Sequence, residues 1–140
     1  MVNSEKLLSK YENSIKDDYS IVTNSLIGIS ANTFFDLAII SGIHKNILAQ
    51  DIFEVSFKTL NRYKQENKKL NPRNSELILK LLALYKKGIE VFGLLDSFNK
   101  WLMKPSYGLG NIIPYSYMNT TTGIDLIFEE VVRIEFGDLA

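Results

Sequence analysis

The long apolar segment at residues 75–92 constrains the fold more than any other feature of the sequence. Its polar residues recur at helical spacing and form one stripe, made by Glu76, Lys80, Lys87 and Glu90. Most of the remaining positions are apolar, among them Leu77, Ile78, Leu81, Leu82, Leu84, Tyr85, Ile89, Val91 and Phe92. A helix with so narrow a polar stripe has to be covered on two sides. We therefore expect residues 75–92 to form a helix at the centre of the fold.

Shorter helices are expected on both sides of this segment. Leu8, Tyr11 and Ile15 fall on one face of a short leading helix. Further helices are expected at residues 32–40, 46–53, 56–64, 97–104 and 114–118, and after the threonine run at 120–122. No alternating strand pattern and no internal repeat is found, so the sequence predicts an all-α fold.

Caps and breakers predict where these helices begin and end. Ser30 and Ser56 are suited to N-caps, and Pro114 to a first helical position. Three glycines follow apolar helical runs and are suited to helix ends: Gly42, Gly93 and Gly137. Pro105 is expected to stop the helix that precedes it. The apolar residues expected in the core of the flanking helices are Phe34, Leu37, Ala38, Phe98, Trp101, Leu102, Ile124, Ile127, Phe128, Val131 and Ile134.

The composition narrows the classes of function. A chain of 140 residues with 46% hydrophobic and 23% charged residues forms one compact domain or two small ones. With no cysteine and a single histidine, a disulfide framework, a zinc–thiolate cluster and a cysteine nucleophile are excluded, and no cofactor or transition metal is expected. No apolar run approaches the roughly 18 residues of a membrane span, and the first residues do not resemble a secretory signal. We expect a cytoplasmic protein.

The charges are balanced overall but separated into blocks. Lysine and arginine total 16, as do aspartate and glutamate. Residues 1–43 carry a net charge of −2, residues 44–87 a net charge of +6, and residues 88–140 a net charge of −4. A basic middle attracts phosphates, and an acidic end suits a basic protein partner. The alternative for each block is a solvated helix face without a partner.

Residues 55–63 are typical of the second helix of a helix-turn-helix motif. Ser56 would cap this helix, while Leu60 and Tyr63 would pack inward. Asparagine and arginine side chains can read base edges, and lysine and threonine side chains can hold phosphates. The candidate DNA-binding residues are Ser56, Lys58, Thr59, Asn61, Arg62 and Lys64.

Two positions depart from the usual helix-turn-helix pattern. The turn carries Glu54 where glycine is usual, and the helix before it has Gln50 where a small alanine is usual, with Ala49 one residue away. The alternative is a structural helix pair that does not bind DNA.

No set of residues predicts catalysis. Gly108 and Gly110 follow a helix and lack the lysine of a phosphate loop, so a turn is expected there. His44 has no cysteine or acid nearby and is interpreted as a surface or capping residue. Glu129 and Glu130 are about 100° apart on a helix, which does not bring their carboxylates together as an acid/base pair. We do not expect an enzyme.

The C-terminal half resembles one family in the order of its motifs. The motifs are residues 88–93, Trp101 and Leu102 with Pro105, Leu109 and Gly110, Pro114, residues 120–123 and residues 134–137. This order is similar to the toxin-binding domain of the Xre/MbcA/ParS antitoxins. Upstream, residues 42–43, 59–62 and 70–76 resemble the Xre-like helix-turn-helix that precedes that domain. One departure is Asn111, where a second glycine is frequent.

The resemblance covers residues 27–140 and implies a domain organisation. Residues 1–26 would be an N-terminal extension, residues 27–72 the Xre-like helix-turn-helix region, and residues 73–140 the toxin-binding domain. The implied architecture is an N-terminal helix-turn-helix bundle packed on a C-terminal helical toxin-binding bundle.

The resemblance implies an antitoxin of a type II toxin–antitoxin pair. The matching toxins are RES-domain proteins that consume NAD, and the antitoxins tend to dimerise, to cover the toxin's NAD pocket and to repress their own operon. The residues that the resemblance favours for toxin binding are Arg133, Glu135, Phe136, Gly137, Asp138, Leu139 and Ala140. The alternative is a DNA-binding regulator whose C-terminal half serves only dimerisation. For an antitoxin of this kind the expected partners are a RES toxin, operator DNA and a second copy of the chain.

Overall fold

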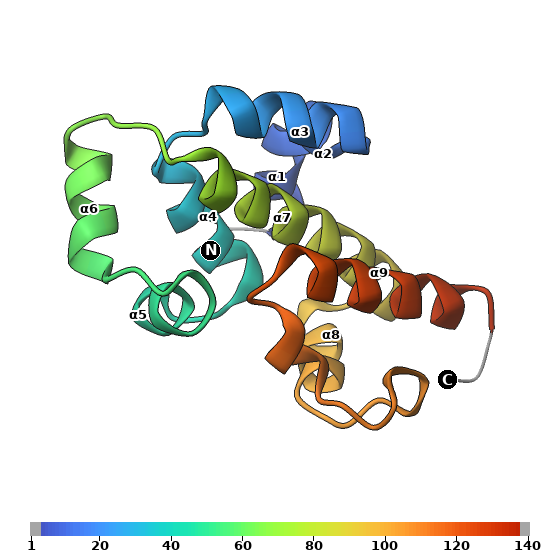
Figure 1. The fold of residues 1–140 in the computed structure, drawn as a ribbon. Helices are drawn as coiled ribbons and strands as arrows, with labels where there is room; N and C mark the ends of the chain where they lie inside the picture. The colour runs from blue at the N-terminus through green and yellow to red at the C-terminus, as the bar shows by residue number, and fades with distance from the viewer. Residues whose placement is uncertain (1–3, 138–140) are drawn as a thin grey trace. The chain divides into compact units, whose positions relative to one another are not determined.

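The computed structural model describes residues 4–137, and these residues form helices and turns without a named strand (Figure 1). The all-α prediction is therefore confirmed. In chain order the elements are α1 (Ser4–Leu8), η1 (Ser9–Tyr11), α2 (Glu12–Ile15), α3 (Asp18–Ile27), α4 (Asn32–Ser41), α5 (Lys45–Leu48), η2 (Ala49–Phe53), α6 (Phe57–Gln65), α7 (Pro72–Phe92), α8 (Leu95–Leu102), η3 (Tyr107–Leu109), η4 (Pro114–Tyr117) and α9 (Thr121–Glu135).

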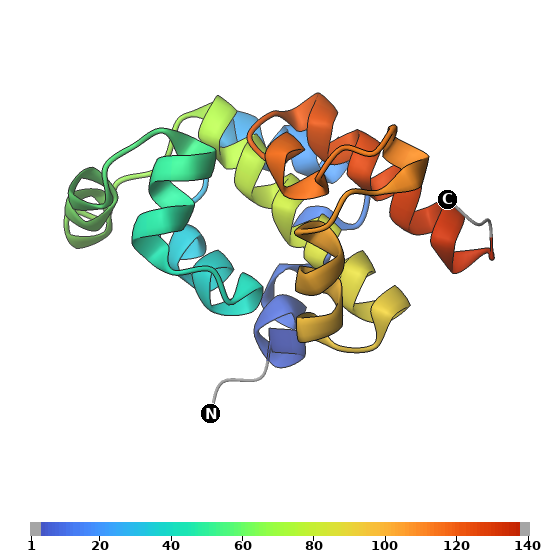
Figure 2. The same ribbon diagram turned by 90° about the horizontal axis from the view of Figure 1, so that it is seen from below.

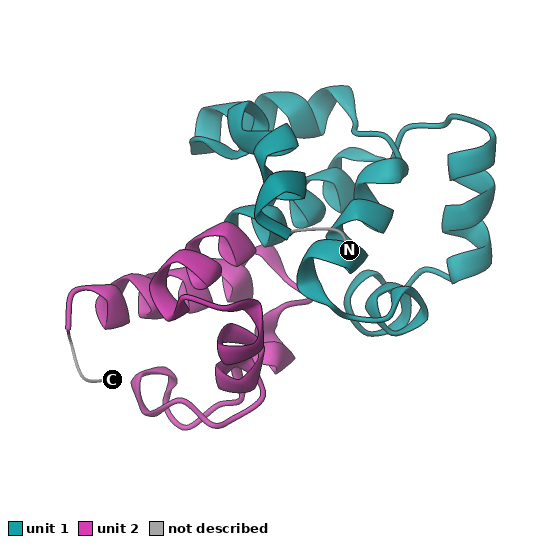
Figure 3. Ribbon diagram, turned by 180° about the vertical axis from the view of Figure 1, so that it is seen from behind, with its two compact units in different colours: residues 1–83 teal, residues 84–140 magenta. Residues whose placement is uncertain are grey.

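The chain divides into two compact units, residues 1–83 and residues 84–140, coloured separately in Figure 3. The division falls inside α7, so one continuous helix supplies residues to both units. The functional boundaries expected after residues 26 and 72 remain predictions, because compactness alone does not define where a binding function begins.

The predicted helix at 75–92 is present and begins earlier, at Pro72. Asn71 accepts a hydrogen bond from the Asn74 backbone N–H at 2.8 Å, which caps the first turn, and proline suits that first position. The expected apolar faces are buried at Leu77, Ile78, Leu81, Leu82, Leu84, Tyr85 and Ile89. Gly93 follows the helix with φ +85°, the left-handed conformation expected of a glycine there.

The N-terminal residues differ from the single short helix expected there. The segment is broken into α1, the 3-10 turn η1 and α2, and it is followed by α3, which the sequence analysis missed. In α3 the buried positions include Ser20 and Ser25, while Tyr19 and Leu26 are exposed. Because two serines share the buried face with Ile21 while most apolar residues of the helix are exposed, α3 lacks the hydrophobic pattern by which a surface helix is recognised.

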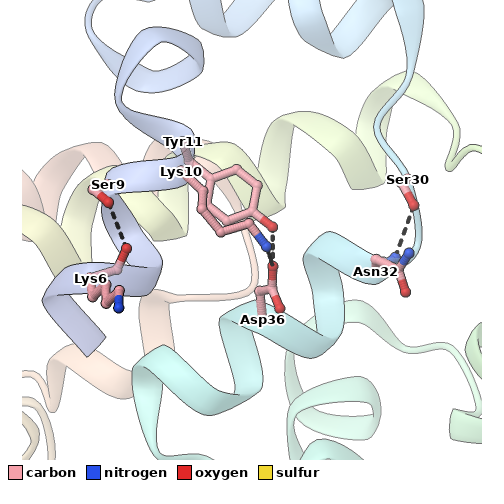
Figure 4. Close-up of polar contacts among 7 residues, drawn as sticks. All are labelled: Lys6, Ser9, Lys10, Tyr11, Ser30, Asn32 and Asp36. Carbon is pink, nitrogen blue, oxygen red and sulfur yellow. Dashed lines mark hydrogen bonds and ion pairs between the residues drawn. The ribbon is translucent and has the colours of Figure 1, made fainter. Parts of the chain in front are cut away.

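An acid–tyrosine contact anchors η1 on α4 (Figure 4). The Tyr11 hydroxyl donates a hydrogen bond to the Asp36 carboxylate, and Lys10 Nζ lies 3.1 Å from Asp36 Oδ2. Burial and the hydrogen bond to Asp36 raise the pKa of Tyr11 well above its usual value. The contact joins residues that are 25 positions apart in the sequence, and so it fixes the leading segment in its unit.

The start of α4 departs from the expected cap. Ala31 occupies the N-cap position and Ser30 does not cap the helix, although Ser30 Oγ accepts a hydrogen bond from Asn32 N at 3.1 Å (Figure 4). Phe34 and Leu37 are fully buried as predicted, whereas Ala38 is only partly buried. The helix ends at Gly42, as expected.

Three hydrogen bonds in the first unit join the α3–α4 turn to the start of α7. Leu70 N donates to Ile29 O at 2.8 Å, while Ser75 Oγ accepts from Ile29 N at 3.1 Å and donates to Leu70 O at 3.2 Å. Gly28 has φ +91°, and a Cβ there would lie 2.8 Å from Leu70 O. These hydrogen bonds therefore require glycine at position 28.

The second unit is built on an aromatic cluster between α7 and α8. The Phe98 ring lies 5.3 Å from the Tyr85 ring, 5.5 Å from the Phe92 ring and 6.0 Å from the Trp101 ring, between ring centroids. A Cβ at Gly88 would overlap the Phe98 ring, so the absence of a side chain allows the close approach of the two helices. Within this unit, α9 runs alongside the segment that contains η3 and η4 (Figure 2).

We predict that Gly88→Ala destabilises the protein by about 1–3 kcal/mol, because the new methyl group overpacks against Phe98. The gain in helix propensity alone would instead stabilise it by about 1 kcal/mol. Urea unfolding monitored by circular dichroism measures the change. The double variant Gly88→Ala/Phe98→Leu should lose less stability than the two single changes added together; strictly additive losses would contradict the packing argument.

We predict that Tyr11 and Tyr85 ionise only when the protein unfolds. Burial raises the pKa of both hydroxyls above the ordinary value of about 10. The stability that they contribute is therefore fully present below about pH 10 and is lost as the pH rises further. Alkaline titration followed by tyrosinate absorbance should show late ionisation of two tyrosines that coincides with unfolding. Tyr11→Phe and Tyr85→Phe should each lose one of these two late ionisations. Ionisation of both residues in the ordinary range with the fold intact would refute the prediction.

Candidate functional site

The N-terminus of α9 is fixed by a side-chain cap and by close packing. Thr120 Oγ1 accepts a hydrogen bond from the Gly123 backbone N–H at 3.0 Å. A Cβ at Gly123 would overlap Tyr117 O, so the first turn of α9 packs directly on the backbone of η4. Ile124, Ile127 and Val131 are then buried, as the sequence analysis predicted. Phe128 and Ile134 are only partly buried.

A buried carboxylate lies on the inner side of α9. Glu130 has 0% of its surface exposed, whereas Glu129 beside it is exposed. Glu130 Oε1 accepts a hydrogen bond from Arg133 Nε at 2.8 Å and lies 2.7 Å from Arg133 Nη2. Glu130 Oε2 accepts no hydrogen bond from the residues that the structure describes. Sequence reasoning missed this group, although Ile127 three residues earlier places Glu130 on the buried face.

Glu130 holds η3 against α9. A Cβ at Gly108 would overlap both carboxylate oxygens of Glu130, so the backbone of η3 sits directly on this side chain. Gly108 is thus required by packing within a turn, in line with the interpretation that it belongs to no phosphate loop. Ser106 N donates to Ile112 O at 2.9 Å and closes the loop around η3.

Asn111 lies at the loop position where a second glycine is expected from the sequence resemblance, and its backbone conformation accounts for that expectation. Asn111 has φ +64°, and Gly110 before it has φ +71°. Asparagine adopts the left-handed region more readily than other residues with a side chain. Asparagine at this position therefore adopts a left-handed backbone conformation that glycine would also allow.

The residues expected to bind a toxin lie at the end of α9. Arg133 makes the ion pair with Glu130, and Glu135 lies 2.7 Å from Lys87 Nζ of α7. Phe136 is 77% exposed, and Gly137 has φ +82°. Asp138, Leu139 and Ala140 lie outside the described residues. Arg133 and Glu135 are thus held by internal partners, while the Phe136 ring is open to contact.

Apolar side chains are also exposed elsewhere in the second unit. Tyr107 on η3 is 77% exposed. Leu94, Met103, Ile113 and Leu126 are exposed as well. Exposed tyrosine, phenylalanine and methionine are typical of protein interfaces, where such side chains supply most of the contact energy.

This geometry agrees with a comparison against known families. Residues 87–137 match the antitoxin Xre/MbcA/ParS C-terminal toxin-binding domain. The match begins at Lys87, ends at Gly137, and includes Gly108, Glu130 and Arg133. It supports an antitoxin role for the protein in general terms. No curated protein matches the chain.

The candidate DNA-binding residues lie on and beside α6. Ser56 Oγ accepts a hydrogen bond from Thr59 N at 3.1 Å, so the predicted cap is present. Leu60 is buried and Tyr63 is partly buried. Lys58, Arg62 and Lys64 are exposed, while Thr59 and Asn61 are partly buried. Lys64 Nζ lies 4.6 Å from the centre of the Phe35 ring of α4.

The turn before α6 accounts for both departures from the helix-turn-helix pattern. Glu54 has φ +54° and ψ +33°, the left-handed conformation for which glycine is usual. The preceding η2 is a π-helix, which contains one more residue in its turn than an α-helix. Ala49 is buried and Gln50 is exposed, so the small residue occupies the packed position one residue earlier in the sequence.

The remaining candidates have structural surroundings. His44 Nδ1 accepts a hydrogen bond from Asn46 N at 3.2 Å and caps α5, in agreement with the capping interpretation. Trp101 belongs to the aromatic cluster of the second unit. Among residues 4–137, no group of three or more histidine, aspartate or glutamate side chains could hold a metal ion. No helix in this range has the length and hydropathy required to cross a membrane.

We predict that Arg133→Ala destabilises the protein by about 1–3 kcal/mol, because it leaves the buried Glu130 carboxylate without its cationic partner. Adding Glu130→Gln to this variant should recover part of the loss by removing the buried charge. Lys87→Ala, which breaks the more exposed pair with Glu135, should cost about 1 kcal/mol or less. Urea midpoints measure all three. Equal stability of Arg133→Ala and the double variant would contradict the argument.

Proposed function

We propose that this protein is an antitoxin that binds a RES-type, NAD-consuming toxin and covers the toxin's active-site cleft. The observation that carries the proposal is the match of residues 87–137 to a toxin-binding domain, a segment that ends beside the exposed Phe136. The contact surface would consist of the end of α9 and the residues that follow it: Arg133, Glu135, Phe136, Gly137, Asp138, Leu139 and Ala140.

Charge and the exposure of Phe136 both support contact through this end of α9. Residues 88–140 carry a net charge of −4, and a cleft that binds the pyrophosphate of NAD presents cations. Carboxylates of the antitoxin would meet those cations in place of the pyrophosphate. The Phe136 side chain, at 77% exposure, would lose much of its contact with water on docking and so provide an apolar anchor.

A second activity is proposed for α6. The exposed Lys58, Arg62 and Lys64, together with Ser56, Thr59 and Asn61, would bind operator DNA, and the antitoxin would repress its own operon as a cytoplasmic homodimer. The capped helix and its exposed cations support this activity. The competing proposal is a DNA-binding regulator without toxin neutralisation, in which the second unit serves dimerisation alone.

We predict that deletion of residues 136–140 restores NAD loss in cells that produce the chain together with the RES-type toxin that the full chain neutralises. The deletion removes the exposed ring and the residues after it and leaves α9 in place. Cellular NAD, measured after toxin induction, should fall with the truncated chain and stay constant with the full chain.

Two controls separate the competing proposals. Tyr19→Ala removes an equally exposed aromatic side chain from the first unit and should leave neutralisation unchanged. Arg62→Ala should weaken operator binding and also leave neutralisation unchanged. Full NAD protection by the truncated chain would reject the proposed contact surface, and failure of the full chain to protect NAD would reject the antitoxin proposal.

A further inference from the structure

We infer that the phosphate-binding surface of this chain continues beyond α6 onto residues 65–71, where Lys68 and Lys69 form a second contact with the sugar–phosphate backbone of nucleic acid. The inference rests on the DNA-binding part of the proposed function. It adds residues that lie outside the candidate recognition helix and contact no base edge.

A groove separates α6 from the segment that follows it. Its volume is about 380 Å³, and the polar residues that line it are Thr59, Tyr63, Lys69, Asn71 and Asn74. These side chains offer an ammonium group, two hydroxyls and two amides. Such neutral donors and a cation are the groups that commonly contact phosphate oxygens along a nucleic-acid backbone.

The backbone that carries the two lysines is held in place. Lys68 N donates to Tyr63 O at 2.9 Å, directly after Asn67, which has φ +57°. Lys69 forms an isolated bridge with Ser30, next to the hydrogen bond from Leu70 N to Ile29 O. Fixed backbone positions lower the entropy lost when the lysines contact a ligand.

Cations of α6 and of the segment after it lie around one aromatic ring, that of Tyr63. Lys68 Nζ lies 5.3 Å from the centre of the Tyr63 ring, and the Arg62 guanidinium carbon lies 5.6 Å from it. Lys68 also lies 3.6 Å from Glu66 Oε1, an exposed ion pair that contributes little. Because Arg62 and Lys68 share Tyr63, the charge of the segment after α6 lies beside that of α6.

The charge density favours a polyanion. Residues 58–73 contain one acid, Glu66, and six bases: Lys58, Arg62, Lys64, Lys68, Lys69 and Arg73. All six basic residues are exposed. Binding of such a surface to nucleic acid releases counterions and is favourable without any apolar contact.

The same surface does not suit a protein partner. Among the described residues, none of the large exposed hydrophobic side chains lies between Ile47 and Leu94. Stable protein interfaces depend on aromatic or aliphatic anchors, and residues 58–73 offer only the partly buried Tyr63 as an aromatic side chain at the surface. A phosphate backbone requires cations and hydrogen-bond donors alone, and the groove provides both.

Salt-dependent DNA binding of charge-matched variants tests the inference. Fluorescence anisotropy would follow binding of the full chain to overlapping duplexes that tile the region upstream of its coding sequence, and to a random-sequence duplex. The Lys68→Ala/Lys69→Ala variant should lower the slope of log association constant against log salt by about 1–2, since each phosphate contact contributes about 0.9. Its affinity should fall equally on all duplexes.

Lys6→Ala/Lys16→Ala is the matched control, because it removes two exposed lysines from the leading segment of the same unit. This control should keep the wild-type slope. Thermal unfolding first shows whether all variants are folded. If the double variant is unstable, the salt dependence is measured on the single variants Lys68→Gln and Lys69→Gln instead.

The outcomes separate the inference from the proposal on which it rests. An unchanged slope in Lys68→Ala/Lys69→Ala, with weakened binding in Asn61→Ala/Arg62→Ala, overturns the inference and leaves DNA binding by α6 intact. Absence of binding by the wild-type chain to every duplex overturns both. Loss of toxin neutralisation with unchanged DNA binding would assign the two lysines to a protein partner and also overturn the inference.

Discussion

The contact between the Glu130 carboxylate, Arg133 and the backbone of Gly108 determines how the second unit presents its surface. A charged group without exposed surface is costly unless it is paired, and here one oxygen is paired with Arg133 while the side chain fills the space in which a residue other than glycine would have its Cβ. The loop that carries Tyr107 is therefore held on α9, the helix that Phe136 follows. Tyr107 and Phe136 are both exposed, and the buried Glu130 side chain connects η3, which carries Tyr107, to α9, which Phe136 follows.

The helices with ordinary signals could be predicted from the sequence. Ser56, Gly42, Gly93 and Pro114 lie where the caps, ends and first helical position were expected, because their effects are local. The apolar faces of the helix at 75–92 were predicted for the same reason. α3 could not be predicted by these criteria, since two of its buried residues are serines and most of its apolar residues, Ile21 excepted, are exposed.

The candidate site was predictable only in part. The order of motifs at residues 88–137 identified a toxin-binding segment, which the family comparison supports. The burial of Glu130 depends on a tertiary contact with Gly108, and a view of Glu129 and Glu130 as adjacent acids could not reveal it. Local structure explains the two departures from the helix-turn-helix pattern, at Gln50 and Glu54. Glu54 adopts the left-handed conformation itself, and the π-helix before it places Ala49 in the buried position in place of Gln50.

Exposed large hydrophobic side chains and clustered cations occupy different parts of the chain. The second unit exposes aromatic and apolar side chains in an acidic background, and residues 58–73 expose cations without apolar anchors. Hydrogen exchange by mass spectrometry, on the chain alone and mixed with the RES-type toxin proposed as its partner, tests whether the second unit is the toxin-binding surface. If it is, the backbone amides at residues 105–112 and 133–137 exchange more slowly in the complex. Protection confined to residues 56–71, with the second unit unchanged, would contradict this assignment.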